Sequence, residues 1–228
     1  MILHLESQWP SSDYLVFVSD FPPYDSAMQA ESGHRKTVKH YHEPGDLHEL
    51  TFSCYRRMPL LTNDDWRKRL SRFIENAKRE MSFDLVAFVY MPEHVHLLVY
   101  PTLPEPDLGR FLARLKQPFS KEIKGILEAA NSPLRSRLTV QERPGKTCFR
   151  FWQEGPGFDR NIFSPETLQS CIDYIHNNPV KRGLCKRAVD WTWSSARYDL
   201  LEPPRQQVPN LPFIDGIPLG AFDKGQPT

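Results

Sequence analysis

Residues 84–100 read DLVAFVYMPEHVHLLVY, two apolar runs joined by a Met-Pro-Glu connection. Each run is rich in β-branched and aromatic residues, which predicts β-strands at Asp84–Tyr90 and His94–Tyr100. Because only three residues join them, the two strands are expected to form an antiparallel hairpin. The sequence therefore predicts a fold that contains an antiparallel sheet.

Two histidines occupy the second of these strands. Side chains of a strand alternate between its faces, so His94 and His96 project from one face while Val95 projects from the other. The two imidazoles therefore face one point, where they could bind a metal ion. In most strands that contain His-x-His, the two histidines are half-buried or face solvent and bind no metal. The motif by itself leaves both interpretations open.

A predicted helix far downstream carries a second pair of polar residues. The capping hydroxyl of Ser164 followed by Pro165 is typical of a helix start. Apolar residues then recur at helical spacing, at Leu168, Cys171, Ile172 and Ile175. Tyr174 and Asn178 are four residues apart, so they lie on one face of the helix, to one side of the apolar stripe. We expect the stripe to pack on the sheet while the phenol and the amide face the strand histidines.

Each member of this second pair also has a simpler interpretation. Buried tyrosines are common and tyrosine nucleophiles are rare, so Tyr174 alone suits a core or interface position. Asn178 precedes Pro179, and the residue before a proline commonly ends a helix. Only the combination of two histidines, a tyrosine and an asparagine indicates a metal-assisted nucleophilic site.

The remaining periodic segments extend the alternation of strands and helices. They are a strand at His48–Tyr55, a helix from Thr62 or Asn63 to about Glu80, a helix from Asp107, a mobile connection at Asn131–Lys146 and a strand at Thr147–Gln153. The order strand, helix, strand, strand, helix, strand, helix predicts an α+β sandwich, an antiparallel sheet with helices on one face.

Three segments, in this order, resemble those of a known protein family. They read YMPEHVHLLVYP at 90–101, YIHNNPVKRGL at 174–184 and WTWSSARY at 191–198. From about His48 to Tyr198 the chain resembles the REP-associated tyrosine transposases, which are single-tyrosine HUH endonucleases, and the resemblance implies a ferredoxin-like fold. Two positions depart from the family: Glu93, where it often has Asn, and Asp159-Arg160, where it often has an Asp-His pair.

The resemblance also implies an activity, namely metal-dependent cleavage and transfer of single-stranded DNA at hairpin-forming repetitive extragenic palindromes. Tyr174 would attack a DNA phosphate and form a 5′-phosphotyrosine link. His94, His96 and Asn178 would hold the metal ion, and such mixed ligands with open positions favour Mg²⁺ or Mn²⁺. These four residues form the expected catalytic set, and the expected oligomeric state is a monomer.

The net charge of the whole chain is +1, but it is unevenly distributed. Residues 50–198 contain 24 Lys or Arg and 16 Asp or Glu, a net charge of +8, whereas residues 1–49 carry −5 and residues 199–228 carry −2. A basic middle segment favours nucleic-acid binding, although any one basic cluster is equally consistent with a solvated helix face. The residues expected to contact DNA are Arg67, Arg110, Arg114, Lys116, Arg150, Lys181 and Arg182.

The composition indicates an intracellular globular chain. Its 228 residues suit one domain with extensions: an N-terminal arm at 1–47, a nuclease or transposase domain at 48–200 and a proline-rich tail at 201–228. The four cysteines show neither zinc-module nor disulfide-framework spacing. We find no signal-peptide pattern and no run of ~20 apolar residues, so we expect a cytoplasmic, nucleoid-associated bacterial protein without a membrane partner.

Two other functions fit parts of the pattern. Histidine-triad nucleotide hydrolases also place alternating histidines in a strand, but their motif needs a third histidine where this chain has Leu98. A protein that binds the repeat hairpin without cutting it is the stronger alternative. Trp191 and Trp193 could stack on DNA bases, although two tryptophans at this spacing are more often one buried and one edge residue.

Overall fold

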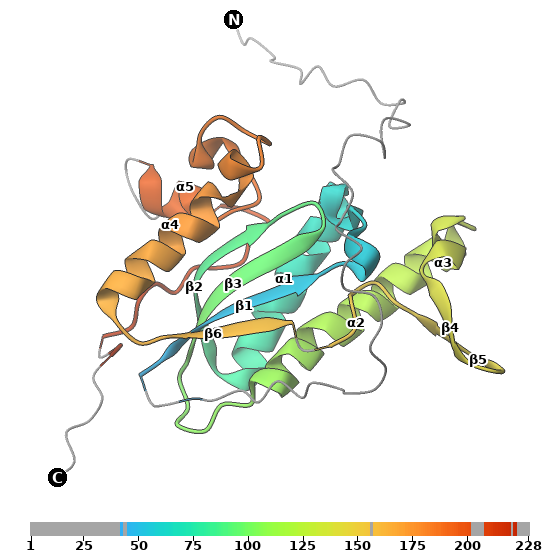
Figure 1. The fold of residues 1–228 in the computed structure, drawn as a ribbon, viewed down its shortest axis with the longest axis horizontal. Helices are drawn as coiled ribbons and strands as arrows, with labels where there is room; N and C mark the ends of the chain where they lie inside the picture. The colour runs from blue at the N-terminus through green and yellow to red at the C-terminus, as the bar shows by residue number, and fades with distance from the viewer. Residues whose placement is uncertain (1–41, 43–44, 156, 202–207, 220, 223–228) are drawn as a thin grey trace, which may run out of the picture. The chain divides into compact units, whose positions relative to one another are not determined.

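A four-stranded antiparallel sheet organises the part of the chain that the computed structural model describes, residues 42, 45–155, 157–201, 208–219 and 221–222 (Figure 1). Its strands are β1 (Leu47–Ser53), β2 (Phe83–Tyr90), β3 (His94–Pro101) and β6 (Phe158–Ile162), in the spatial order β2-β3-β1-β6. Every pairing in it is antiparallel. The hairpin predicted from the sequence is therefore confirmed, and its histidine-bearing strand lies inside the sheet, beside β1.

Three long helices begin where the sequence supplies a capping side chain. They are α1 (Asp64–Met81), α2 (Leu108–Ala129) and α4 (Pro165–Lys181), with the N-caps Asn63, Asp107 and Ser164. Each cap accepts a hydrogen bond from a backbone N–H of the first turn, which satisfies a donor that has no partner within the helix. Shorter helical segments are α5 (Ala196–Leu200) and the 3₁₀ turns at Tyr55–Arg57, Leu60–Thr62 and Ala188–Asp190.

The sheet is covered on both faces. Leu50 of β1 and Leu97 of β3 belong to a core that includes the apolar faces of α1 and α2, whereas Leu98 belongs to a second core with Leu168 and Ile175 of α4. The expected ferredoxin-like α+β fold is confirmed, but the expectation of helices on one face holds only for α1 and α2. Because the central strands carry apolar side chains on both faces, the second face also needs a cover, and α4 provides it.

The segment between α2 and β6 differs from the sequence-based prediction. The residues expected to form a mobile connection contain α3 (Leu134–Arg137) and β4 (Thr139–Arg143), and β4 pairs with β5 (Lys146–Phe149) in a separate hairpin. Pro144 and Gly145 occupy the turn, and the φ angle of +74° at Gly145 suits glycine. The predicted strand at Thr147–Gln153 was therefore only partly right. The fourth strand of the main sheet is β6, an edge strand too polar to show apolar alternation.

Part of the predicted C-terminal tail packs on the domain. Within Val208–Leu219, Ile214 is buried, and Asp215 exchanges hydrogen bonds with the backbone of Leu85 at 2.7 and 2.9 Å. Asp215 also forms an ion pair with the buried Lys78. These contacts cover the free edge of β2, where unpaired backbone groups would otherwise be exposed. Most of the predicted N-terminal arm lies outside the described residues.

The cysteines of the chain lie in different environments, two of them buried. All four cysteines are free. Burial raises the pKa of Cys171 to about 12, so this side chain stays a thiol. Among the described residues, no helix is both long and apolar enough to span a membrane.

A buried histidine fastens α4 to the C-terminal half of the domain. His176 Nε2 lies 2.8 Å from Ser195 Oγ, which in turn accepts a hydrogen bond from the backbone N–H of Phe88 in β2. Burial lowers the pKa of His176 to about 4, even though Asp173 and the carboxylate of Asp199, 3.4 Å away, both favour its charged form. The histidine is therefore neutral in the folded protein at pH 7.

We expect the domain to lose stability as the pH falls from about 6.5 to about 4. In this window the unfolded chain binds a proton at His176 and the folded chain does not, so the free energy of unfolding should fall by roughly 3 kcal/mol. Urea unfolding at several pH values measures this, and His176→Gln, which cannot be protonated, should show a shallower pH dependence. A wild-type protein that gains stability on acidification would mean that the pair with Asp199 dominates instead.

Candidate active site

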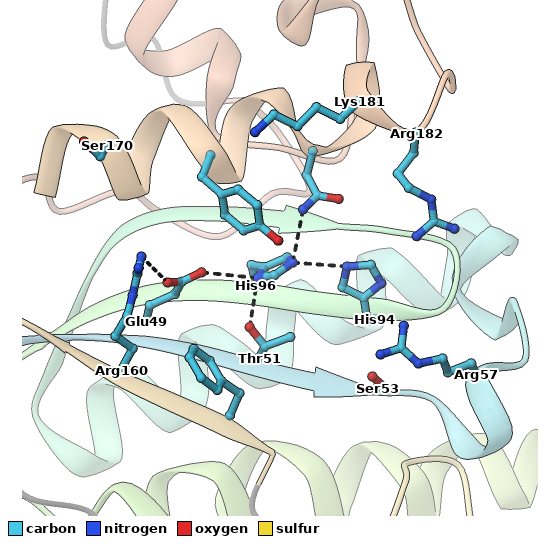
Figure 2. A pocket seen from close by; sticks show the side chains of 13 residues that line it. Glu49, Thr51, Ser53, Arg57, His94, His96, Arg160, Ser170, Lys181 and Arg182 are labelled. Carbon is cyan, nitrogen blue, oxygen red and sulfur yellow. Dashed lines mark hydrogen bonds and ion pairs between the residues drawn. The ribbon is translucent and has the colours of Figure 1, made fainter. Parts of the chain in front are cut away.

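A polar cavity of about 670 Å³ opens on the sheet face that α4 covers (Figure 2). It collects side chains from β1, β3, β6 and α4, elements that are far apart in the sequence. Its lining residues include Glu49, Thr51, Ser53, Arg57, His94, His96, Phe158, Arg160, Tyr174, Asn178, Lys181 and Arg182. The cavity therefore brings together all four residues of the expected catalytic set.

Three polar atoms meet at the floor of the cavity. The Nε2 atoms of His94 and His96 lie 3.1 Å apart, and the Asn178 side-chain amide reaches His96 Nε2 at 3.3 Å. All three side chains are buried. Helix α4 does not end before Pro179 but continues to Lys181, which places Asn178 within the helix and above the sheet.

The other ring nitrogen of each histidine has a partner that fixes the ring. His94 Nδ1 lies 3.2 Å from Glu93 Oε1. His96 Nδ1 lies 2.8 Å from Thr51 Oγ1 and 3.6 Å from Glu49 Oε1, as Figure 2 shows. An ionised carboxylate can only accept a hydrogen bond, so both rings favour the tautomer that carries the hydrogen on Nδ1. Two Nε2 lone pairs would then face each other at 3.1 Å, an arrangement that needs a proton or a cation between them.

Burial lowers the pKa of one histidine of the site, and neighbouring groups lower the pKa of the two carboxylates. Burial is the main cause that lowers the pKa of His94. Burial alone would raise the pKa of Glu93, but its contacts with His94 and Arg182 outweigh this and lower it to about 2. For Glu49, burial is likewise outweighed by His96 and Arg160, which lower its pKa. Imidazoles held by carboxylates are common ligands of transition-metal ions.

The donor set fits a divalent ion that takes further ligands from a substrate. Among the described residues, no three His, Cys, Asp or Glu side chains are grouped to hold a metal by themselves. The candidate site is therefore two imidazoles completed by an amide. Asn178 presents Nδ2 to His96, so metal binding requires the amide to turn by half a rotation and present Oδ1. Such an N,N,O set leaves positions open for phosphate oxygens.

Tyr174 stands beside this donor set. Its ring meets the ring of His96 edge-on, with centroids 5.4 Å apart, and 40% of the residue is exposed to the cavity and solvent. The Lys181 ammonium lies 5.0 Å from the centre of the tyrosine ring. A tyrosine of the apolar core would be buried, whereas the Tyr174 phenol is exposed between a histidine and a lysine.

Basic side chains line the cavity, and two of them pair with the carboxylates that contact the histidines. Arg182 Nη1 lies 2.8 Å from Glu93 Oε1, and Arg160 Nη2 lies 2.7 Å from Glu49 Oε2. Arg57 also lines the cavity. The sequence-based prediction had missed Arg57, Arg160 as a cavity residue, and the polar side chains of β1, although Glu49, Thr51 and Ser53 alternate visibly with buried apolar residues.

The other predicted DNA contacts lie elsewhere. Arg67 is buried, and its guanidinium lies 5.4 Å and 5.3 Å from the rings of Trp191 and Trp193, so these three side chains pack on one another inside the fold. Arg110, Arg114 and Lys116 are on α2, across the sheet from the cavity, and Arg150 pairs with Glu142 and Glu154. Of the predicted contacts, only Lys181 and Arg182 line the cavity.

The chain is similar to known REP-associated tyrosine transposases. Over 120 residues the chain is 32% identical to a candidate REP-associated tyrosine transposase of Haemophilus influenzae, which covers 52% of this chain and 61% of that protein. Over 145 residues it is 29% identical to the REP-associated tyrosine transposase of Escherichia coli K12, covering 64% and 72%. The chain thus spans less than two thirds of the Haemophilus relative.

A solved structure shares the fold. It is that of a REP-associated tyrosine transposase bound to a REP hairpin, which matches with a TM-score of 0.54 at 22% identity and covers 83% of this chain and 99% of that chain. The family model described as "Transposase IS200 like" matches residues 46–178, more than half of the chain and a range that contains both histidines, Tyr174 and Asn178. This chain belongs to the IS200-like transposase family.

Proposed function

We propose that this protein is a metal-dependent endonuclease and strand transferase that acts on single-stranded DNA next to hairpins of repetitive extragenic palindromes. The observation that carries the proposal is the meeting of His94 Nε2, His96 Nε2 and the Asn178 amide beside the exposed phenol of Tyr174. Family membership and the names of the two relatives support the choice of DNA and of the repeat hairpin as the substrate.

Tyr174 is the nucleophile in the proposed reaction. Its hydroxyl oxygen forms a bond to a backbone phosphorus while the bond from that phosphorus to the 3′-oxygen of the preceding nucleotide breaks. The phenol loses its proton, and the departing 3′-oxygen gains one. The resulting 5′-phosphotyrosine link keeps the phosphodiester energy, so a DNA 3′-hydroxyl can reverse the step without ATP.

The surrounding side chains position and neutralise the attacked phosphate. A divalent ion held by His94, His96 and Asn178, Mg²⁺ or Mn²⁺, would supply positive charge where negative charge develops on the phosphate oxygens. Glu49 and Glu93 keep the two imidazoles in the ligating tautomer. Lys181 reaches over the tyrosine ring, where its ammonium can bind a phosphate oxygen.

Replacing Tyr174 with phenylalanine should abolish cleavage and leave hairpin binding within about twofold of wild type, because only an exposed hydroxyl is removed. The test incubates full-length protein with labelled hairpin-bearing single strands and Mn²⁺, and a denaturing gel reports the covalent adduct. An adduct formed by the variant would reassign the nucleophile. A wild type that binds the hairpin but never forms an adduct would favour the alternative of a non-cutting binding protein.

Replacing Asn178 with alanine should slow cleavage at low Mn²⁺ and leave a defect that more Mn²⁺ partly relieves. Loss of one of three protein ligands should weaken metal affinity by about 10- to 100-fold, as seen for smaller changes around metal sites. Asn177→Ala is the matched control, because Asn177 is exposed and donates a hydrogen bond within its own helix, to Asp173 O. Superimposable Mn²⁺ titrations of wild type and Asn178→Ala would remove Asn178 from the site.

Replacing Lys181 with alanine should make DNA binding less sensitive to salt. Each phosphate neutralised on a single strand contributes about −0.7 to the slope of log affinity against log salt, so the slope should become shallower by about that amount. Lys186→Ala removes the same charge from an exposed site away from the cavity and should change the slope less. Equal slopes for the two variants would mean that only the total charge of the protein matters.

A further inference from the structure

Phe158 is an exposed aromatic side chain inside the polar cavity. Its exposed fraction is 55%. Among the described residues it belongs to neither apolar core and contacts no other aromatic ring. Packing of the fold therefore does not explain why a large apolar ring lies among arginines, lysines and carboxylates.

The backbone holds Phe158 next to the candidate catalytic residues. Phe158 pairs across the sheet with Thr51, whose hydroxyl contacts His96. Side chains of paired residues lie on the same face of a sheet, about 5 Å apart at their Cβ atoms. Only β1 separates the strand of Phe158 from the strand of His96. The phenyl ring lies on the face of the sheet that α4 covers.

Three contacts hold β6 and the residue before it against β1. Gly157 has a φ angle of +85°, and a Cβ atom at this position would lie 2.2 Å from the carbonyl oxygen of Thr51, so the backbone packs directly against β1. Asp159 bonds to His48 at 3.0 Å on one face, and Arg160 pairs with Glu49 at 2.7 Å on the other. The backbone at Phe158 is therefore held in place before a ligand binds, which lowers the entropy cost of binding.

We infer that Phe158 is a stacking platform for an unpaired DNA base that flanks the attacked phosphate. Single-strand binding sites combine cationic side chains for the backbone with an aromatic face for the bases. Here the cationic part is Arg57, Arg160, Lys181 and Arg182, and the ring supplies the apolar face. Stacking tolerates any base, so Phe158 would position the strand without reading its sequence. The inference rests on the proposed function, because it assumes that a single strand enters this cavity.

The decisive experiment measures binding with the metal chelated, so that cleavage does not interfere. Labelled hairpin-bearing single strands carry 2-aminopurine, or an abasic residue, at successive unpaired positions. Full-length wild type should quench 2-aminopurine at one position, and Phe158→Ala should lose this quenching and weaken binding on the order of 10-fold. Phe158→Tyr should retain both. Phe163→Ala is the matched control, because Phe163 is 60% exposed just after the same strand but does not line the cavity.

An abasic residue at the quenched position should weaken wild-type binding and should not weaken Phe158→Ala further. Equal losses for Phe158→Ala and Phe163→Ala, or additive effects of the abasic residue and Phe158→Ala, would overturn the stacking role. If wild type binds the strand and forms the covalent adduct with Mn²⁺ while Phe158→Ala binds normally, only this inference fails. If wild type does not bind the strand, this inference and the proposed function fail together.

Discussion

The register between β1 and β3 is the constraint on which the whole site depends. It pairs Thr51 with His96 and Ser53 with His94. Because successive side chains of a strand point to opposite faces, a slip of one residue would turn both histidines into the core that α1 and α2 complete. The apolar side chains of the same strands, such as Phe52 and Val95, prevent that slip, since it would expose them to the cavity. Packing of the core on one face of the sheet thus determines that the two histidines lie on the other face.

Helix α4 performs two tasks with two parts of its surface. Its apolar stripe packs on the sheet, and buried His176 fastens it to Ser195. The same packing holds Tyr174 and Asn178 over β3, although neither residue contributes to the apolar core. Since a helix one turn out of register would carry the phenol about 5.4 Å along its axis, the position of the tyrosine depends on contacts remote from it.

Two carboxylates link the histidines of the site to arginines. Glu93 lies between His94 and Arg182, and Glu49 lies between His96 and Arg160. In each case one carboxylate orients a histidine on one side and neutralises a guanidinium on the other. A phosphate that binds near either arginine would therefore change the electrostatic environment of the histidine that shares its carboxylate.

Local patterns in the sequence were sufficient to predict the hairpin, the helix starts and the pairs of residues that share a face. The apolar runs around Met91-Pro92-Glu93, the caps at Asn63, Asp107 and Ser164, and the four-residue spacing of Tyr174 and Asn178 each depend on neighbours along the chain. The resemblance to the family joined the two pairs into one expected site. Such information needs no knowledge of distant contacts, because it follows from the periods of strands and helices.

Only the tertiary structure decided which polar residues share the cavity. Nothing local to Glu49, Phe158 or Arg160 marks them as neighbours of His96, since strand pairing brings them there from far along the chain. Arg67 shows the converse: its sequence context is that of a surface cation, yet Trp191 and Trp193 enclose it. Charge and polarity are properties of a single residue and can be read from the sequence. Burial and proximity depend on which distant segments pack together, so only the folded chain reveals them.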